Sequence, residues 1–146
     1  GEPKVELGYI RDMIEGRDTT RPYIFSVDGE DAGYIQVWYV REYQVPSWAD
    51  DYPWLTTLPA NAVGVDLSIA DAGRLAKGLG PRVLGAFVGM LREQGHETII
   101  IDPDPGNRRA VRAYEKSGFR VIADLVGRTG DCLLMQHMPG VNEHHP

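Results

Sequence analysis

The spacing of apolar residues along the first third of the chain predicts a helix followed by a β-hairpin. In residues 4–16 apolar side chains recur at helical spacing and a glycine follows them, so a helix is expected there. Residues 22–27 and 32–41 are rich in β-branched and aromatic side chains, and Asp28 and Gly29 lie in the turn between them. An Asp-Gly turn between two such runs is typical of a hairpin.

The middle of the chain alternates between an irregular segment and a regular strand. Residues 42–61 hold three prolines and two tryptophans without a clear period, which indicates a long loop of the kind that carries function. Residues 62–69 alternate strictly, so one face belongs to a core and the other is small and polar. The core-facing set is Val63, Val65, Leu67 and Ile69, and the opposite set is Ala62, Gly64, Asp66 and Ser68.

The remaining pattern predicts two helices, a buried strand and a second hairpin. Residues 78–95 carry an apolar stripe of helical period, Leu79, Val83, Phe87, Met90 and Leu91. An unbroken apolar run within 97–102 is typical of a strand in a sheet interior, and Asn107 is expected to cap a helix over 108–117. Residues 119–126 and 132–138 then form an apparent hairpin. The fold class is therefore α/β, a mixed sheet flanked by helices, in one domain over 1–146.

Composition and charge narrow the possible partners. A chain of 146 residues suits one domain, and its net charge of −6 argues against nucleic acid and is compatible with a cationic small molecule. No apolar stretch is long enough to span a membrane, and no signal-peptide core is visible.

A single cysteine, Cys132, excludes an internal disulfide and favours a cytoplasmic setting. It is expected to be a small core residue in the last strand, away from the candidate motifs. The sequence does not predict the oligomeric state.

Residues 75–80, LAKGLG, lie between the predicted strand and helix, where a ligand phosphate can bind. Glycines permit close backbone approach, and a helix start offers unpaired N–H groups and a positive dipole end. The alternative is a tight turn that simply needs glycine. The known nucleotide-binding signatures do not fit this segment.

Asn107 and Tyr114 form the second candidate constellation. They are seven residues apart and therefore share one helix face. Asn107 either caps the helix or reaches a ligand amide, and Tyr114 either protonates a leaving thiolate or belongs to the core. The histidines lack partners at metal-ligand spacing, so no metal site is expected.

Taken together, these segments resemble the GNAT superfamily of acyl-coenzyme A N-acyltransferases. That family has a pyrophosphate loop of the form [Q/R]xxGx[G/A] and a downstream N-x-x-A-x-x-x-Y-E-K-x-GF segment. The second pattern is present here as Asn107, Ala110, Tyr114, Glu115, Lys116, Gly118 and Phe119. The loop departs at Leu75, which stands where Gln or Arg is usual, but backbone N–H groups do most of the phosphate binding.

A closer resemblance, over residues 20 to 120, is to the aminoglycoside 6'-N-acetyltransferases, on GVDLSIADAGRLAKGLG and IDPDPGNRRAVRAYEKSGF. The resemblance implies transfer of acetyl from acetyl-CoA to an amine, with Asp66 and Tyr114 catalytic. It implies an acceptor site at Trp54, Asp66 and Asp102. The implied coenzyme site comprises Leu67, Ile69, Leu75, Ala76, Lys77, Gly78, Leu79, Gly80, Asn107 and Ala110.

Two features of the resemblance leave alternatives open. The loop acids Asp50 and Asp51 are shifted relative to the family, so an acyltransferase acting on a lysine or hydroxylamine nitrogen in siderophore assembly is an alternative. A second alternative is a GNAT domain that binds coenzyme A without turnover. GNAT domains also open with a strand and one or two helices before the hairpin, whereas one helix is predicted here. Roughly 40 residues of the fold, its usual N-terminal strand and helix, are therefore expected to be missing.

Overall fold

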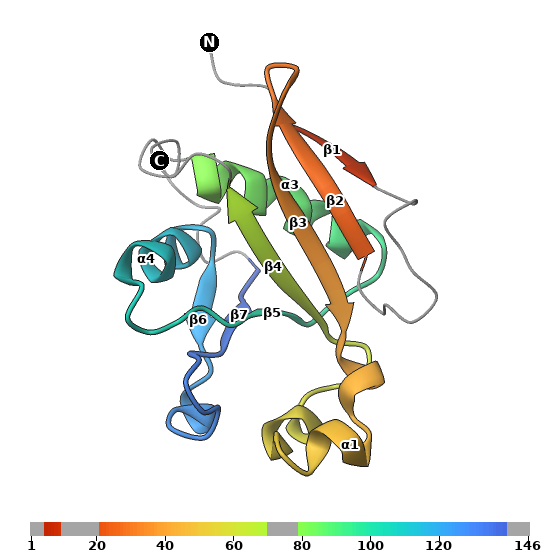
Figure 1. The fold of residues 1–146 in the computed structure, drawn as a ribbon, viewed down its shortest axis with the longest axis vertical. Coiled ribbons are helices and arrows are strands. Elements are labelled where there is room, and N and C mark those ends of the chain that lie inside the picture. Colours follow the sequence, from red (N-terminus) through yellow and green to blue (C-terminus); the bar gives the residue numbers. More distant parts are fainter. Residues whose placement is uncertain (1–4, 10–20, 70–78, 140–146) are drawn as a thin grey trace.

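The computed structural model describes residues 5–9, 21–69 and 79–139, which form a seven-stranded sheet with helices packed against it (Figure 1). The strands are β1 (Val5–Tyr9), β2 (Arg21–Val27), β3 (Glu30–Tyr39), β4 (Val63–Ile69), β5 (Ile99–Ile101), β6 (Phe119–Val121) and β7 (Met135–His137). The α-helices are α1 (Pro46–Ala49), α3 (Leu79–Glu93) and α4 (Arg108–Lys116), and the 3-10 helices are η2 (Val40–Tyr43), η3 (Pro53–Thr57) and η4 (Ala123–Leu125).

The strands follow the order β1-β2-β3-β4-β5-β7-β6, and the sheet is mixed. Every neighbouring pair is antiparallel except β4 and β5, which run parallel. Parallel strands need a crossover connection, and α3 lies on the path between these two (Figure 1). The predicted fold class, a mixed sheet with flanking helices, is confirmed.

The helix predicted over 4–16 is wrong in its first part. Residues 5–9 form β1, which pairs antiparallel with β2 from Val5 opposite Val27 to Tyr9 opposite Tyr23. Leu7 packs against the core while Glu6 is exposed, so the segment follows a period of two rather than the helical period. A strand edge offered by β2 therefore overrides the weaker helical spacing. A strand, not a helix, is the first described element, and residues 10–16 lie outside the described ranges.

Both predicted hairpins are present, and turn chemistry explains the first. Asp28 and Gly29 have φ of 52° and 86°, which are the left-handed values that a tight hairpin turn requires. The C-terminal pair β6–β7 is shorter than predicted, because the chain leaves the sheet after Val121 and turns through η4.

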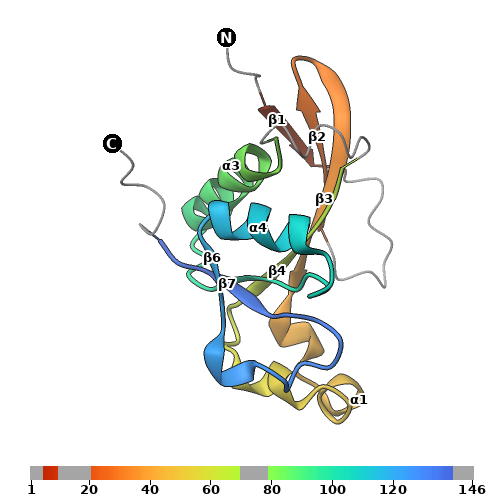
Figure 2. The ribbon, with the colours of Figure 1, turned by 90° about the vertical axis from the view of Figure 1, so that its left-hand side faces the viewer.

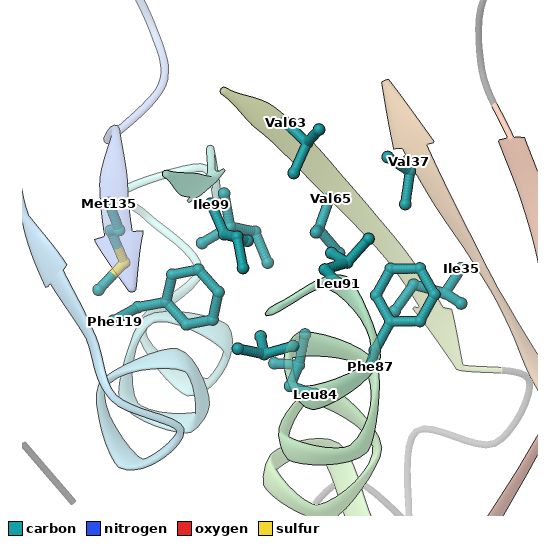
Figure 3. Packing of buried hydrophobic residues seen from close by; sticks show 12 residues of the cluster. Ile35, Val37, Val63, Val65, Leu84, Phe87, Leu91, Ile99, Phe119 and Met135 are labelled. Atoms are coloured by element: carbon teal, nitrogen blue, oxygen red, sulfur yellow. The ribbon is translucent and has the colours of Figure 1, made fainter. Parts of the chain in front are cut away.

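One face of the sheet packs against α3, with α4 beside it (Figures 2 and 3). Alternate side chains of β3 and β4 supply the sheet side of this core, and the predicted stripe of α3 supplies Phe87 and Leu91, both fully buried. Leu84, which the predicted stripe omitted, is equally buried in the same cluster. Val111 and Tyr114 of α4 are partly buried against it. This core fixes α3 and α4 on a single face.

The segment from Val40 to Ala62, which the sequence predicted to be a loop, lies where β3 ends and β4 begins and packs there against the face of the sheet opposite α3 (Figures 1 and 2). It contains three short helical turns, η2, α1 and η3, at the end of β3 and β4 (Figure 1). A second buried cluster ties it to the sheet and to η4: Val40, Trp54, Leu55, Leu58, Ala62, Ile100, Leu125 and Leu134. The sheet therefore separates the helix-covered face from an opposite face that this segment covers at one end, called here the loop-covered face.

Candidate active site

Asp66 and Asp102 are neighbours because β4 and β5 run parallel. The ladder pairs Val65 with Ile101, and each aspartate is the next residue along its chain. Since side chains alternate along a strand, both aspartates lie on the face opposite Val65, which belongs to the helix-covered core. Two carboxylates from segments far apart in sequence thus meet on the loop-covered face.

The two carboxylates form the floor of a cavity of about 250 Å³. Trp54, the residue expected in the substrate loop, lies in the same cavity. The lining consists of Trp38, Tyr43, Trp48, Tyr52, Trp54, Leu55, Asp66 and Asp102. Sequence reasoning did not single out the contribution of Trp38, although it alternates with the core-facing Val37 and so had to face the other side. Asp50 and Asp51 are exposed and do not line this cavity.

The cavity shifts the proton affinity of both carboxyls. Burial, reinforced by the negative charge of Asp66, raises the pKa of Asp102 from 3.8 to about 6, against a smaller opposing effect of a backbone hydrogen bond. Burial also raises the pKa of Asp66 above its ordinary value, although that residue keeps part of its surface exposed. Near neutral pH, Asp102 therefore exchanges between a protonated form and the more abundant ionised form. The ionised form can pair with a cation.

Tyr114 approaches the two carboxylates from the other face of the sheet. It is half-buried against the helix-covered core, with its ring 6.3 Å from that of Phe119 in an edge-on arrangement. Burial raises the pKa of Tyr114, and the charges of Asp66 and Asp102 raise it further. The phenol is thus within electrostatic range of both carboxyls, and it stays protonated at neutral pH.

Groups from the two faces can meet because the parallel ladder stops early. The pairing of β4 with β5 ends at Val65 and Ile101, whereas β4 continues through Leu67 to Ile69. Beyond Val65, β3 pairs with one side of β4, and no strand in the described residues is paired with its other side. The sheet is thus open between the helix side and the loop side.

The other residues expected to bind a coenzyme have mixed outcomes. The Asn107 side chain accepts a hydrogen bond from the Ala110 backbone N–H at 3.2 Å, so it caps α4 as predicted. Ala110 is buried, and Leu67 packs partly into the core. Ile69 ends β4, and Leu79 and Gly80 begin α3. Leu75, Ala76, Lys77 and Gly78 lie outside the described residues.

The expectation for Cys132 is wrong in both position and surroundings. It precedes β7 in a turn, where its Sγ lies 3.1 Å from the carbonyl oxygen of Thr129, and it is only half-buried. The charge of Asp102 contributes to a raised pKa of its thiol, after the larger effect of burial. Cys132 therefore lies near the candidate site, because the turn before β7 packs alongside the end of β5, as the hydrogen bond from Leu133 N to Pro103 O records.

A larger cavity of about 440 Å³ lies between α3, the end of α4 and the end of β7. It shares no lining residue with the carboxylate cavity, and its lining includes Arg92 and His137, whose side chains are 3.0 Å apart. Across the described ranges, no group of three metal-ligating side chains occurs. Nor does any helix there have the length and apolar character needed to cross a membrane.

Replacing Asp102 with asparagine is expected to stabilise the fold at alkaline pH by about 1–2 kcal/mol. Ionising Asp102 costs more in the folded protein than in the unfolded chain, because its pKa is raised from 3.8 to about 6. This cost is absent when the pH is below the unfolded-state pKa of 3.8 and complete when it is above the folded-state pKa of about 6. Wild-type stability therefore falls as the pH rises between these two pKa values. Thermal unfolding at about pH 4 and about pH 8 checks this. A variant equally stabilised at both pH values would contradict it.

The chain and its fold are similar to known proteins. The profile of the acetyltransferase (GNAT) domain matches residues 1–126. The chain belongs to this family, as its motifs indicate.

Several of the proteins that this chain resembles carry names of aminoglycoside-modifying or aminoglycoside-resistance proteins. An aminoglycoside N(6')-acetyltransferase type 1 of Klebsiella pneumoniae is 36% identical over 132 residues, which cover 90% of this chain and 62% of that protein. A kanamycin resistance protein of Rhizobium radiobacter is 47% identical over 73 residues, which cover 49% of this chain and 68% of that protein. The solved structure of the aminoglycoside acetyltransferase AAC(6')-Ib with coenzyme A and kanamycin has a TM-score of 0.68 and 29% identity, over 84% of this chain and 69% of the other. The chain thus spans less than two thirds of the length of the Klebsiella relative.

Proposed function

We propose that this chain transfers an acetyl group from acetyl-CoA to a primary amine of a cationic small molecule, with the 6'-amino group of an aminoglycoside as the acceptor. The observation that carries the proposal is the pair Asp66 and Asp102 in one aromatic-lined cavity where the β4–β5 ladder ends. The partly buried Tyr114, whose pKa both charges raise, supports it from the other face. The named relatives, among them an aminoglycoside 6'-N-acetyltransferase and a kanamycin resistance protein, support the choice of acceptor.

The carboxylate pair suits an amine that arrives as an ammonium ion. A primary amine has a reference pKa near ~10.4 and is protonated at neutral pH, so it must lose a proton before it attacks a carbonyl. Asp66 and Asp102 hold the ammonium by charge, and their raised pKa values make them stronger bases than ordinary carboxyls. We assign Asp66 the orienting role and the acceptance of that proton, and Asp102 the second negative charge.

The opening beside β4 suits the thioester end of acetyl-CoA, which supplies the activated acetyl group. The backbone of β4 from Asp66 to Ile69 has no strand partner on that side within the described residues, so its N–H groups are available to a thioester carbonyl. The start of α3, at Leu79, adds the helix dipole for the diphosphate. We therefore propose that the coenzyme side of the site is the helix-covered face, with Asn107 acting through the cap of α4.

Tyr114 is suited to the last proton transfer. Its raised pKa keeps the phenol protonated, so it can donate to a departing thiolate, whose conjugate acid has a reference pKa near ~8.5. The ammonium gives up two protons in all. The carboxylates take the first before the attack, and the second leaves the nitrogen of the tetrahedral adduct and replaces the proton that Tyr114 donates to the thiolate. The C–S bond of the thioester breaks as the amide C–N bond remains, so the balance closes without a covalent enzyme intermediate. No metal ion is part of the proposal.

The proposal places the reaction in a single domain over 1–146 and in the cytoplasm. A lone cysteine, Cys132, suits a reducing compartment, and the net charge of −6 suits a cationic acceptor rather than nucleic acid or an anionic membrane surface.

Acetyl-CoA-dependent thiol release tests the proposal. The panel contains a 6'-amino aminoglycoside such as kanamycin, its 6'-hydroxy analogue, and lysine-type and hydroxylamine-type amines. Release with the 6'-amino compound and not with the hydroxy analogue is expected. Release with the lysine-type or hydroxylamine-type amines alone would favour the siderophore-type acyltransferase instead. Acetyl-CoA binding without thiol release on any amine would overturn the proposal in favour of a binding domain.

A further inference from the structure

The side-chain amide of Gln44 links two parts of the segment that covers the carboxylate cavity. Its Nε2 donates hydrogen bonds to the backbone carbonyl oxygens of Leu55 and Leu58, at 2.8 and 2.9 Å. Both donors of the amide are thus used, and both acceptors lie more than ten residues along the chain. Gln44 directly follows η2, whereas Leu55 belongs to η3 and Leu58 caps its end. One side chain therefore holds η2 against η3.

The residues around this link form a continuous row of rings. The ring of Tyr43 packs edge-on against Trp38 at 5.4 Å and against Trp48 at 5.1 Å, and Trp48 packs against Tyr52 at 6.1 Å. We call these four residues the aromatic wall. All four line the cavity that also contains Asp66.

The two ends of the aromatic wall differ in how they are held. Trp38 lies directly over Gly64 of β4, so closely that a β-carbon at Gly64 would overlap the indole. Trp48 and Tyr52 instead leave 45% and 46% of their surfaces exposed. Trp48 lies in the four-residue α1 and Tyr52 directly precedes η3. Turns this short are not stable alone, so these rings depend on contacts within the segment, which Gln44 holds together at η3.

We propose that Gln44 is a positioning residue, which fixes the aromatic wall so that its exposed rings bind the apolar face of a ring-bearing acceptor. The inference rests on the proposed function and deepens it. The carboxylates attract any ammonium ion, whatever carries it, because charge attraction depends little on shape. Flat rings held in place favour flat saccharide faces over flexible chains, since less side-chain freedom is lost on binding. The wall therefore selects amines carried on rings, and Gln44 acts through it.

The test compares two acceptors in two variants. Gln44→Met keeps the length of the side chain and removes both hydrogen bonds, whereas Thr57→Val removes a hydrogen bond from the same segment that stays within η3, from Oγ1 to the carbonyl of Trp54. For Gln44→Met, the KM of the ring acceptor kanamycin is expected to rise about tenfold with kcat nearly unchanged, while the KM of a flexible diamine such as cadaverine stays constant. Thr57→Val is expected to leave both unchanged.

A double mutant separates positioning from general damage. If Gln44 acts through the wall, Gln44→Met is expected to have no further effect on the KM of kanamycin once Trp48→Ala is present. Equal losses for kanamycin and cadaverine, or full additivity with Trp48→Ala, would overturn the inference.

Tryptophan fluorescence tests the role of Gln44 even if the protein turns over no acceptor. The chain has three tryptophans, and all three line this cavity, so its tryptophan emission reports on the site. Acrylamide is expected to quench Gln44→Met at least about twofold more strongly than wild type and Thr57→Val. Unchanged quenching would overturn the role of Gln44. If wild type releases no thiol with any amine while this difference in quenching is present, the proposed function fails and the link by Gln44 stands.

Discussion

Replacement of Tyr114 with phenylalanine is expected to lower kcat by about a hundredfold or more. Burial and the charges of Asp66 and Asp102 raise the pKa of the phenol, and under the proposed function its removal leaves the departing thiolate without a donor from the chain. The ring itself is retained, so its packing against Phe119 and the core is preserved. Steady-state thiol release with acetyl-CoA and kanamycin measures the effect.

Binding of acetyl-CoA to the same variant serves as the control. Its dissociation constant, measured by calorimetry, is expected to change by less than about twofold, because the phenol acts on the leaving group rather than on the bound coenzyme. An unchanged kcat would remove Tyr114 from the acid role. A large loss of coenzyme affinity would instead assign it to binding.

Replacement of Asp66 with asparagine is expected to lower kcat/KM for the amine by about two to three orders of magnitude. Asparagine keeps the shape but removes the negative charge, which under the proposed function orients the ammonium and accepts its proton. Asp102 remains, with a lower pKa than in wild type because the charge of Asp66 no longer opposes its ionisation. The acid limb of the pH profile of kcat/KM is therefore expected to move to lower pH while the whole profile drops.

Asp104→Asn is the matched control for that experiment. Asp104 is exposed, lies two residues after Asp102, and does not line the cavity; its Oδ1 accepts a hydrogen bond from Gly106 N–H, which asparagine can also accept. Its kinetics are expected to match wild type within about twofold. Equal losses in the two variants would mean that general negative charge, not the position of Asp66, supports binding.

The elements that the sequence predicts best are those specified by local chemistry. The hairpin around Asp28 and Gly29 depends on two left-handed residues, and the start of α4 depends on one side-chain hydrogen bond from Asn107. Each signal lies within a few residues of the element that it defines. The structure has both where the sequence indicates them.

The elements that it predicts badly depend on distant partners. Residues 5–9 are a strand because β2 offers an edge, and nothing within those residues specifies that edge. The cavity depends on the same kind of information. The pairing of Val65 with Ile101 brings Asp66 beside Asp102, and the packing of Tyr43 between Trp38 and Trp48 forms the aromatic wall. Individual residues of the site were visible from the sequence, whereas the wall required tertiary packing.

The order of strands also has a consequence for how the chain folds. β1 to β4 are neighbours in both sequence and space, so they can form one after another from short-range contacts. β5 can join β4 only after α3 has crossed over, and β7 must insert between β5 and β6. Asp66 and Asp102 directly follow the last pair of the β4–β5 ladder, one within β4 and one just after β5, so they come together only when β5 has joined β4. A nascent chain therefore has a nearly complete meander before it has the carboxylate cavity, and conditions that slow the closing of the β4–β5 junction delay the cavity more than they delay compaction.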